Sequence, residues 1–172
     1  MSGLFTIPLS GLKEGQHLYD FEIGDDFFEE FEESEIKEGN LSASIVLDKR
    51  SSHFDLIFKI NGRVKVSCDR CLGMFFQPVE SENKLLVKFG KEWDDSDPDL
   101  ITIPADENEL DVKQYLYEFI QLALPIQKVH RGGSKENECD SEMIKKLREH
   151  IVGEEKESDP RWDELKKLIN NN

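Results

Sequence analysis

Three cysteines and one histidine are the residues of this chain whose types and spacing could perform chemistry. Cys68 and Cys71 form a Cys-x-x-Cys pair in the stretch VSCDRCLGMFF, at the end of a run of alternating apolar residues. His130 and Cys139 flank a later polar stretch. Thiolate sulfur and imidazole nitrogen are the ligands of tetrahedral structural zinc sites, and a Cys-x-x-Cys turn can supply two of them. The sequence therefore predicts a candidate zinc site in which Cys68 and Cys71 are completed by His130 and Cys139.

Two other interpretations of the cysteine pair remain open. The pair can be a tight turn of reduced, partly buried thiols that pack as small hydrophobic groups. It can also be a redox pair, which requires a lowered thiol pKa at a helix N-terminus within a β-α-β unit. The stretch GMFFQPVE that follows the pair contains glycine and proline and is typical of extended chain. We therefore expect a structural turn first, half of a zinc site second and a redox centre last.

The overall charge of the chain limits its partners. Its 172 residues contain 22 Lys and Arg against 37 Asp and Glu, which gives a formal net charge of −15. Such a charge opposes nonspecific association with a phosphate backbone unless basic residues cluster locally. With 37% hydrophobic and 34% charged residues, some acidic segments are expected to lie outside the core.

Several classes of function lack their sequence signatures. The chain contains no G-x-S-x-G, G-x-x-x-x-G-K-[ST] or H-E-x-x-H motif, so we do not expect an enzyme. No small-molecule substrate is expected either. The first residues, MSGLFTIPLSGLKEG, lack the basic and apolar regions of a signal peptide, and no later run approaches the roughly 20 apolar residues of a membrane span. The expected location is the cytoplasm, with no membrane partner.

One segment is less acidic than the rest of the chain. Between positions 48 and 70 there are six basic residues and three acidic ones. Arg63 and Lys65 share the same parity on a predicted strand and project from its polar face, and Arg70 lies in the cysteine turn beyond. We interpret Arg63, Lys65 and Arg70 as candidate RNA-binding residues. An ordinary solvent-facing strand surface accounts for the same residues.

The elements that must position these side chains are predicted mainly as strands. Apolar residues alternate with polar or small ones over positions 41–47 and 54–60, and the same parity continues through Val64 and Val66 to Cys68. A two-residue hairpin at Asn61-Gly62 would place apolar side chains beside polar ones. We therefore expect a three-residue loop there, or one long strand bent at Gly62.

Helices are predicted at four places. The acidic, aromatic stretch DDFFEEFEESEIKEG is typical of a short amphipathic helix. A capping-box pattern at Asp111 begins a longer apolar face that ends before Pro125. Ser141 can cap a third helix. Asp159 followed by Pro160 begins a fourth, whose apolar face needs a docking surface on its own domain or on a partner. The candidate partner-binding residues of that face are Trp162, Leu165 and Ile169.

These elements predict an α+β fold: a mainly antiparallel, strongly bent β-sheet packed by one long amphipathic helix, with short C-terminal helices. The expected organisation is a single α+β core domain over 1–130, a polar, flexible segment with a short helix over 131–158, and a capped helix over 159–172. A chain of this length buries one ordinary core.

The order of the motifs resembles a known family. The CDRCL turn, an acidic loop, a helix ending in LALP, a following VH and a cysteine, and the terminal DPRWDELKKL occur in this order. This order is similar to that of the YceD family, the large ribosomal RNA subunit accumulation proteins, over about the last two thirds of the chain. Cys68, Arg70, Cys71 and Leu72 match the cysteine turn of the family. His130 and Cys139 match the histidine and cysteine that follow its LALP helix.

The resemblance implies a bacterial, cytoplasmic, non-enzymatic factor needed for normal accumulation of 23S ribosomal RNA. Such a factor would act in maturation of the large subunit by binding precursor ribosomal RNA, a ribosomal protein, or both. Binding of a basic ribosomal protein agrees better with the net charge. The alternative is a zinc-stabilised adaptor unconnected with ribosomes, which holds a protein partner through its acidic surface or its terminal helix.

Overall fold

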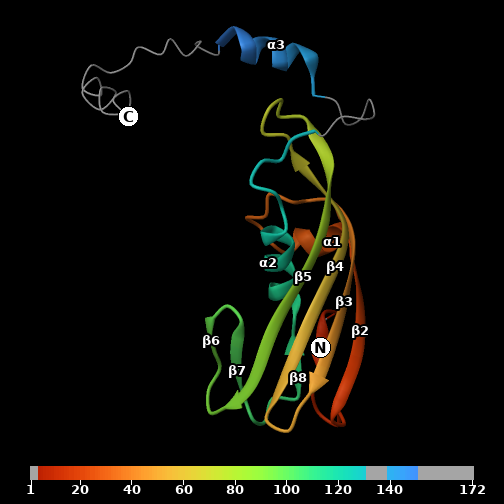
Figure 1. Ribbon diagram of the computed structural model, residues 1–172, viewed down its shortest axis with the longest axis vertical. Coiled ribbons are helices and arrows are strands. Elements are labelled where there is room, and N and C mark those ends of the chain that lie inside the picture. The colour runs from red at the N-terminus through yellow and green to blue at the C-terminus, as the bar shows by residue number, and fades with distance from the viewer. Residues whose placement is uncertain (1–3, 131–138, 151–172) are drawn as a thin grey trace, which may run out of the picture.

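A six-stranded sheet forms the body of the molecule in the computed structural model, which describes residues 4–130 and 139–150 (Figure 1). The strands follow the order β2-β3-β4-β5-β7-β6 across the sheet. Their bounds are β2 Gly15–Ile23, β3 Gly39–Lys49, β4 His53–Ser67, β5 Met74–Gly90, β6 Asp94–Asp97 and β7 Leu100–Pro104. A second, two-stranded sheet pairs β1, Thr6–Pro8, with β8, Glu109–Asp111.

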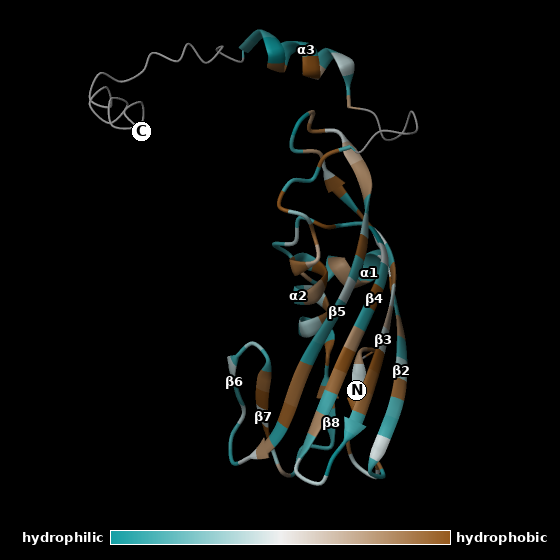
Figure 2. Cartoon of the chain, in the orientation of Figure 1, coloured by the Kyte–Doolittle hydropathy of each residue, from teal (hydrophilic) through white to brown (hydrophobic). Residues whose placement is uncertain are grey.

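The strands β2 to β5 form because their sequences alternate with period two. Buried or partly buried side chains alternate with more exposed ones along them, and hydrophobic and hydrophilic residues alternate visibly along the long strands (Figure 2). β4 continues without a break through Asn61 and Gly62, so neither a hairpin nor a three-residue loop forms there. One long strand forms, as the other expectation had it, but its register with β3 and β5 shows no shift at Gly62. Gly62 has a φ of 153°, and a Cβ at this position would lie 2.3 Å from the carbonyl oxygen of Asn40. A glycine therefore lets β3 approach β4 closely.

One face of the sheet, here called the inner face, carries the hydrophobic core. The helices α1, Asp25–Glu29, and α2, Lys113–Leu122, lie on this side (Figure 1). α1 contributes Phe27 and Phe28, which are buried as expected for the acidic, aromatic stretch. Phe119 of α2 packs edge-on against Phe58 of β4, with ring centroids 5.0 Å apart. The opposite face of the sheet, the outer face, is not covered by either helix.

The expected fold class is wrong in its helices. Strands make up 48% of the described residues and helices only 18%, so the chain is mostly β rather than α+β with one long amphipathic helix. α2 has ten residues because the expected cap, Asp111, is the last residue of β8, and because helical hydrogen bonding ends at Ala123. The third described helix, α3, covers Ser141–His150. In the part of the chain that the structure describes, no helix has the length and apolar composition to cross a membrane.

The expected sheet is also wrong in two respects. The sheet is mixed rather than mainly antiparallel, because β7 lies parallel to β5, and it is not strongly bent. The parallel pair arises because part of the acidic stretch expected as a loop forms β6, which pairs with the outer edge of β7. The sheet stays unbent because the registers of β3 with β4 and of β4 with β5 run without a bulge.

Candidate metal centre and the adjoining surface

The cysteine turn, defined as residues 68–73, joins the ends of β4 and β5. The backbone N–H of Cys68 donates to the carbonyl of Gly73 at 2.9 Å, and that of Leu72 donates to the carbonyl of Cys68 at 2.8 Å. Leu72 has a φ of 60°, in the left-handed region, which turns the chain back toward β5. The turn buries both of its thiols, with Cys68 0% and Cys71 4% exposed.

A second segment of chain brings His130 to this turn. The N–H of Asp69 donates to the carbonyl of Lys128 at 2.7 Å, and the N–H of Lys128 donates to the Asp69 carboxylate at 2.6 Å. The ammonium of Lys128 lies 2.9 Å from the carboxylate of Glu35. The ring of His130 packs against Phe75 with centroids 4.6 Å apart. These residues, which are not ligands themselves, hold the segment after α2 beside the cysteine turn.

The structure brings the four sequence-predicted ligands together. The sulfur atoms of Cys68 and Cys139 are 3.8 Å apart, and Nδ1 of His130 lies 3.5 Å from the sulfur atoms of both Cys71 and Cys139. All four ligand atoms lie within 4.8 Å of one another. A tetrahedral zinc ion with bonds of about 2.3 Å to sulfur and about 2.0 Å to nitrogen has edges of about 3.8 Å between sulfurs and about 3.5 Å between sulfur and nitrogen. The set therefore has the size and chemistry to hold one metal ion.

Hydrogen bonds and burial act oppositely on two of the thiols. Burial raises the pKa of Cys68, but hydrogen bonds from the backbone N–H groups of Arg70, Cys71 and His130 and from the Cys71 thiol outweigh it, so its pKa falls to about 6. Burial, hydrogen bonds with Cys71 and Cys68, and the charges of those two thiols raise the pKa of Cys139 to about 11. The thiolate, which Cys68 forms near neutral pH, is the form that binds metals.

The geometry suits metal ligation better than redox chemistry. A lowered thiol pKa is common to both functions. Reactive thiols are partly exposed, however, whereas Cys68 is fully buried. The turn also joins two strands and does not open a helix. The three cysteines are free, and a sulfur separation of 3.8 Å is far longer than the roughly 2.05 Å of a disulfide bond.

The three candidate RNA-binding residues make different contacts. Arg63 is exposed on the outer face, and its guanidinium lies 4.8 Å from the centroid of the Phe76 ring. Lys65 is paired with Glu38, whose carboxylate oxygens lie 2.7 and 2.9 Å from the ammonium. Arg70 is exposed in the cysteine turn, and among the described residues its side chain has no ion-pair partner. Among the described residues, therefore, no carboxylate compensates the charges of Arg63 and Arg70, whereas Glu38 compensates that of Lys65.

Three exposed apolar side chains beside these arginines were not predicted as functional. Leu72, Met74 and Phe76 are 68%, 54% and 44% exposed, and the last two alternate along β5 with the buried Phe75. The signal in the sequence is a run of apolar residues at both odd and even positions. A strand with only one buried face carries polar residues at every second position instead. We call this surface the arginine–aromatic patch, defined as Arg63, Arg70, Leu72, Met74 and Phe76.

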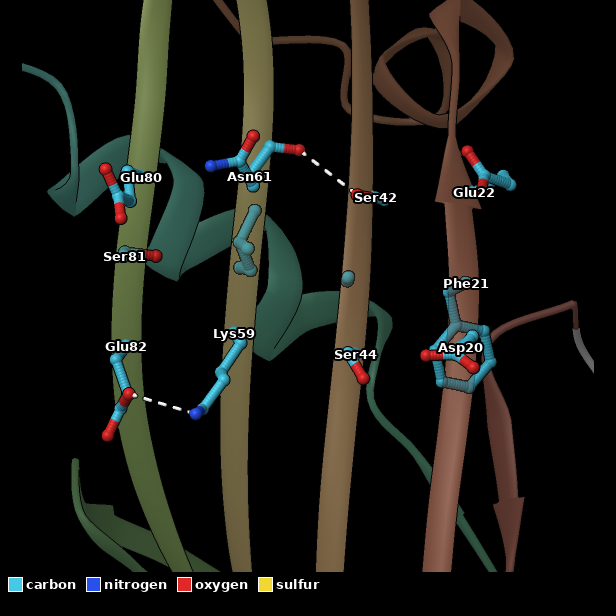
Figure 3. Close-up of a pocket in the computed structure, with 12 residues that line it drawn as sticks. Asp20, Phe21, Glu22, Ser42, Ser44, Lys59, Asn61, Glu80, Ser81 and Glu82 are labelled. Atoms are coloured by element: carbon cyan, nitrogen blue, oxygen red, sulfur yellow. Dashed lines mark hydrogen bonds and ion pairs between the residues drawn. The ribbon is translucent and has the colours of Figure 1, made fainter.

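The middle of the outer face has the opposite character. A hollow of about 730 Å³ lies there across β2 to β5 (Figure 3). Its four carboxylates come from Asp20 and Glu22 on β2 and from Glu80 and Glu82 on β5. Lys59 of β4 extends its side chain toward β5, and its ammonium lies 3.5 Å from the carboxylate of Glu82 (Figure 3). In the described part of the chain, the other three carboxylates have no ion-pair partner, so the open face of the sheet is acidic here.

The predicted partner-binding residues fall elsewhere. Trp162, Leu165 and Ile169 lie outside the residues that the structure describes. They stay a prediction from sequence.

Comparison with known proteins identifies the family of the chain. A family model described as "Large ribosomal RNA subunit accumulation protein YceD" matches residues 56–169. The match includes most of β4, all of β5 and all four candidate ligands. No curated protein and no solved structure gives a match. Because the family model matches more than half of the chain, this protein belongs to the YceD family.

Proposed function

We propose that this protein is a non-enzymatic factor of the bacterial cytoplasm that supports accumulation of 23S ribosomal RNA during maturation of the large subunit. Its membership of a family described as large ribosomal RNA subunit accumulation proteins carries this proposal. The chemistry of the site agrees with it. The candidate ligands are two buried and two partly buried side chains, which is typical of a closed structural metal site.

The factor acts by binding precursor 23S ribosomal RNA, a large-subunit ribosomal protein, or both. Two surfaces support these two modes. The uncompensated arginines of the patch have the charge to contact phosphate. The acidic hollow on the outer face and the net charge of −15 suit a basic ribosomal protein.

The metal that we assign to the site is zinc. A set of three thiolates and one imidazole, with edges close to those of a tetrahedron around zinc, supports this choice. When bound, zinc would supply a structural cross-link between the cysteine turn and the segment that carries His130 and Cys139.

The C-terminal apolar residues complete the proposal. Trp162, Leu165 and Ile169 share one face of a predicted helix that is short for independent stability, so we assign them to docking on a partner. Substitution of Trp162 by alanine is expected to reduce co-purification with large-subunit precursors. Unchanged co-purification would remove this role.

The proposed function is tested by deleting the gene in its own host. We expect the amount of mature 23S ribosomal RNA to fall relative to 16S ribosomal RNA on blots of total RNA, and to recover when the gene is restored. The 16S species serves as the internal control, because the proposed role is limited to the large subunit. A 23S to 16S ratio that is the same with and without the gene, across growth temperatures, would overturn the proposal.

A further inference from the structure

The arginine–aromatic patch has a local charge opposite to that of the whole molecule. Three neighbouring cations, Lys59, Lys65 and Lys128, each pair with a glutamate. Arg63 and Arg70, in contrast, have no carboxylate partner among the residues that the structure describes. In a chain of net charge −15, two uncompensated arginines mark the part of the surface that a polyanion can approach.

The apolar part of the patch is a rigid, exposed aromatic surface. Phe76 belongs to β5, where it is paired in register with Lys65 of β4, and the pairing continues to the last residue of β4 and the first of β5. Arg63 lies over the Phe76 ring at 4.8 Å, so an aromatic ring and a guanidinium group are adjacent on one face. Leu72 and Met74 extend this surface toward the cysteine turn.

This combination of side chains matches unpaired RNA. Nucleobases that are not in a duplex stack on exposed aromatic rings and on guanidinium groups, while arginine side chains contact the phosphates between them. Bases inside a duplex are already stacked and cannot use the ring in this way. A basic protein segment would be repelled by the two uncompensated arginines.

We infer that the arginine–aromatic patch binds an unpaired segment of RNA, with a nucleobase stacked on Phe76 and with Arg63 and Arg70 at its phosphates. This inference rests on the proposed function and makes it more specific, because it names single-stranded RNA as the ligand and the patch as its site. The cysteine turn contributes Arg70 and Leu72, so a metal bound by the candidate ligands would hold one edge of the patch in place.

The test is fluorescence anisotropy with the full-length, zinc-loaded protein. The probes are a labelled 12-nucleotide oligouridylate, a labelled 12-nucleotide oligoadenylate and a labelled 12-base-pair RNA duplex. We expect tighter binding of the single strands than of the duplex. Substitution of Phe76 by alanine is expected to weaken single-strand binding by about fivefold or more, the loss that removal of one stacked base produces. Phe76→Trp is expected to restore it.

Two control variants on the outer face make the test specific. Leu18→Ala removes an apolar side chain that is 62% exposed on β2, and Lys84→Ala removes an exposed cation of β5, both outside the patch. Neither control is expected to weaken binding of the single-stranded probes to the extent expected for Phe76→Ala and Arg63→Ala. Circular dichroism and zinc content establish that each variant is folded and loaded. Equal affinities of Phe76→Ala and Leu18→Ala, or preference for the duplex, would overturn the inference.

Failure of this inference can be told apart from failure of the proposed function. If deletion of the gene lowers 23S ribosomal RNA but the patch variants bind single-stranded RNA as the unsubstituted protein does, the proposed function stands and the patch is not its RNA site. If the protein binds none of the three probes, the inference is likewise overturned, and binding of a ribosomal protein becomes the mode of action.

Discussion

His130 joins the two parts of the candidate metal site. Its Nδ1 lies 3.5 Å from the sulfur atoms of both Cys71 and Cys139, and its ring is supported by Phe75. Its position follows from the hydrogen bonds that Lys128 makes two residues earlier. Loss of this imidazole leaves three thiols, two of which belong to the cysteine turn.

We predict that His130→Ala abolishes stoichiometric zinc binding and lowers the melting temperature. Elemental analysis of the unsubstituted protein should give about one zinc per chain, and chelation should lower its melting temperature by roughly 5–10 °C. The variant should melt at the lower temperature with or without chelator. His17→Ala is the matched control, because His17 is partly exposed and its ring bonds only to the carbonyl of Lys13 among the described residues. A stable, metal-free protein would contradict the zinc assignment.

The thiol of Cys68 predicts a pH dependence for the metal-free protein. Its pKa falls from an ordinary value of 9.0 to about 6 in the folded chain. Between these two values the unfolded chain binds a proton at Cys68 that the folded chain does not, so the contribution to stability rises with pH from about 6 to 9 and is lost below pH 6.

This contribution is measured as a difference between two proteins. Melting temperatures of the metal-free protein and of its Cys68→Ser variant are recorded at pH 6, 7 and 8.5. The gap between them is expected to widen as the pH rises. A constant gap would mean that no thiolate is stabilised at this position.

The residues of the candidate metal site could be predicted from sequence because metal coordination accepts few residue types. A Cys-x-x-Cys pair followed by the remaining cysteine and a nearby histidine left few other combinations. The exposed position of Phe76 could not be predicted in the same way. The residues around Phe76 are apolar at both odd and even positions, so alternation does not show which of them are buried. Only the register between β4 and β5 decides whether Phe75 or Phe76 faces outward.

At the scale of elements, the length of β4 and β5 determines where the site lies. The two strands pair from His53 with Lys88 to Ser67 with Met74, and the cysteine turn closes this long ribbon. Gly62 permits this uninterrupted pairing, because β3 passes so close to its α-carbon that a side chain would not fit there. The strands therefore carry the candidate ligands and the patch to one end of the sheet.

We predict that Gly62→Ala destabilises the fold by roughly 2–4 kcal/mol. A Cβ would meet the carbonyl oxygen of Asn40 at 2.3 Å and the α-carbon of Leu41 at 2.5 Å, and the φ of 153° is strained for alanine. Gly24→Ala is the control, because an added methyl group would have no atom within 4 Å and φ is −107°. Urea unfolding monitored by circular dichroism gives both free energies of unfolding. Equal values for the two variants would contradict the close approach of β3.

Local patterns predicted the strands better than their arrangement. Period-two alternation identified β3 and β4 because one face of each is buried. The parallel pairing of β5 with β7 depends on the mostly acidic segment Asp94–Asp97 forming an edge strand, which its composition disfavours. The length of α2 depends on the pairing of β8 with β1, a contact between distant parts of the chain.

At the scale of the whole molecule, charge is distributed unevenly over the outer face. The acidic hollow occupies the middle of the sheet, and the arginine–aromatic patch occupies the end at the cysteine turn. The net charge of −15 repels RNA over distances comparable to the Debye length, about 10 Å at 0.1 M salt. RNA is therefore expected to approach this protein at the patch and to be kept away from the hollow.

We predict that removing carboxylates from the hollow strengthens RNA binding. The double variant Glu22→Gln, Glu80→Gln should bind the single-stranded probes roughly two- to threefold more tightly at about 20 mM salt, because two repulsive charges are lost. The difference should disappear at about 500 mM salt, where charges are strongly screened. Weaker binding by the variant at low salt would show that the hollow contacts the ligand instead of repelling it.

The most direct measurement is ultraviolet crosslinking of the tagged protein in growing cells, followed by sequencing of the attached RNA. The unsubstituted protein is compared with Phe76→Ala at equal abundance. We expect enrichment of precursor 23S ribosomal RNA at discrete unpaired sites, and loss of these sites in the variant. Recovery of background RNA alone would contradict direct contact with ribosomal RNA and would leave a protein partner as the route by which this factor acts.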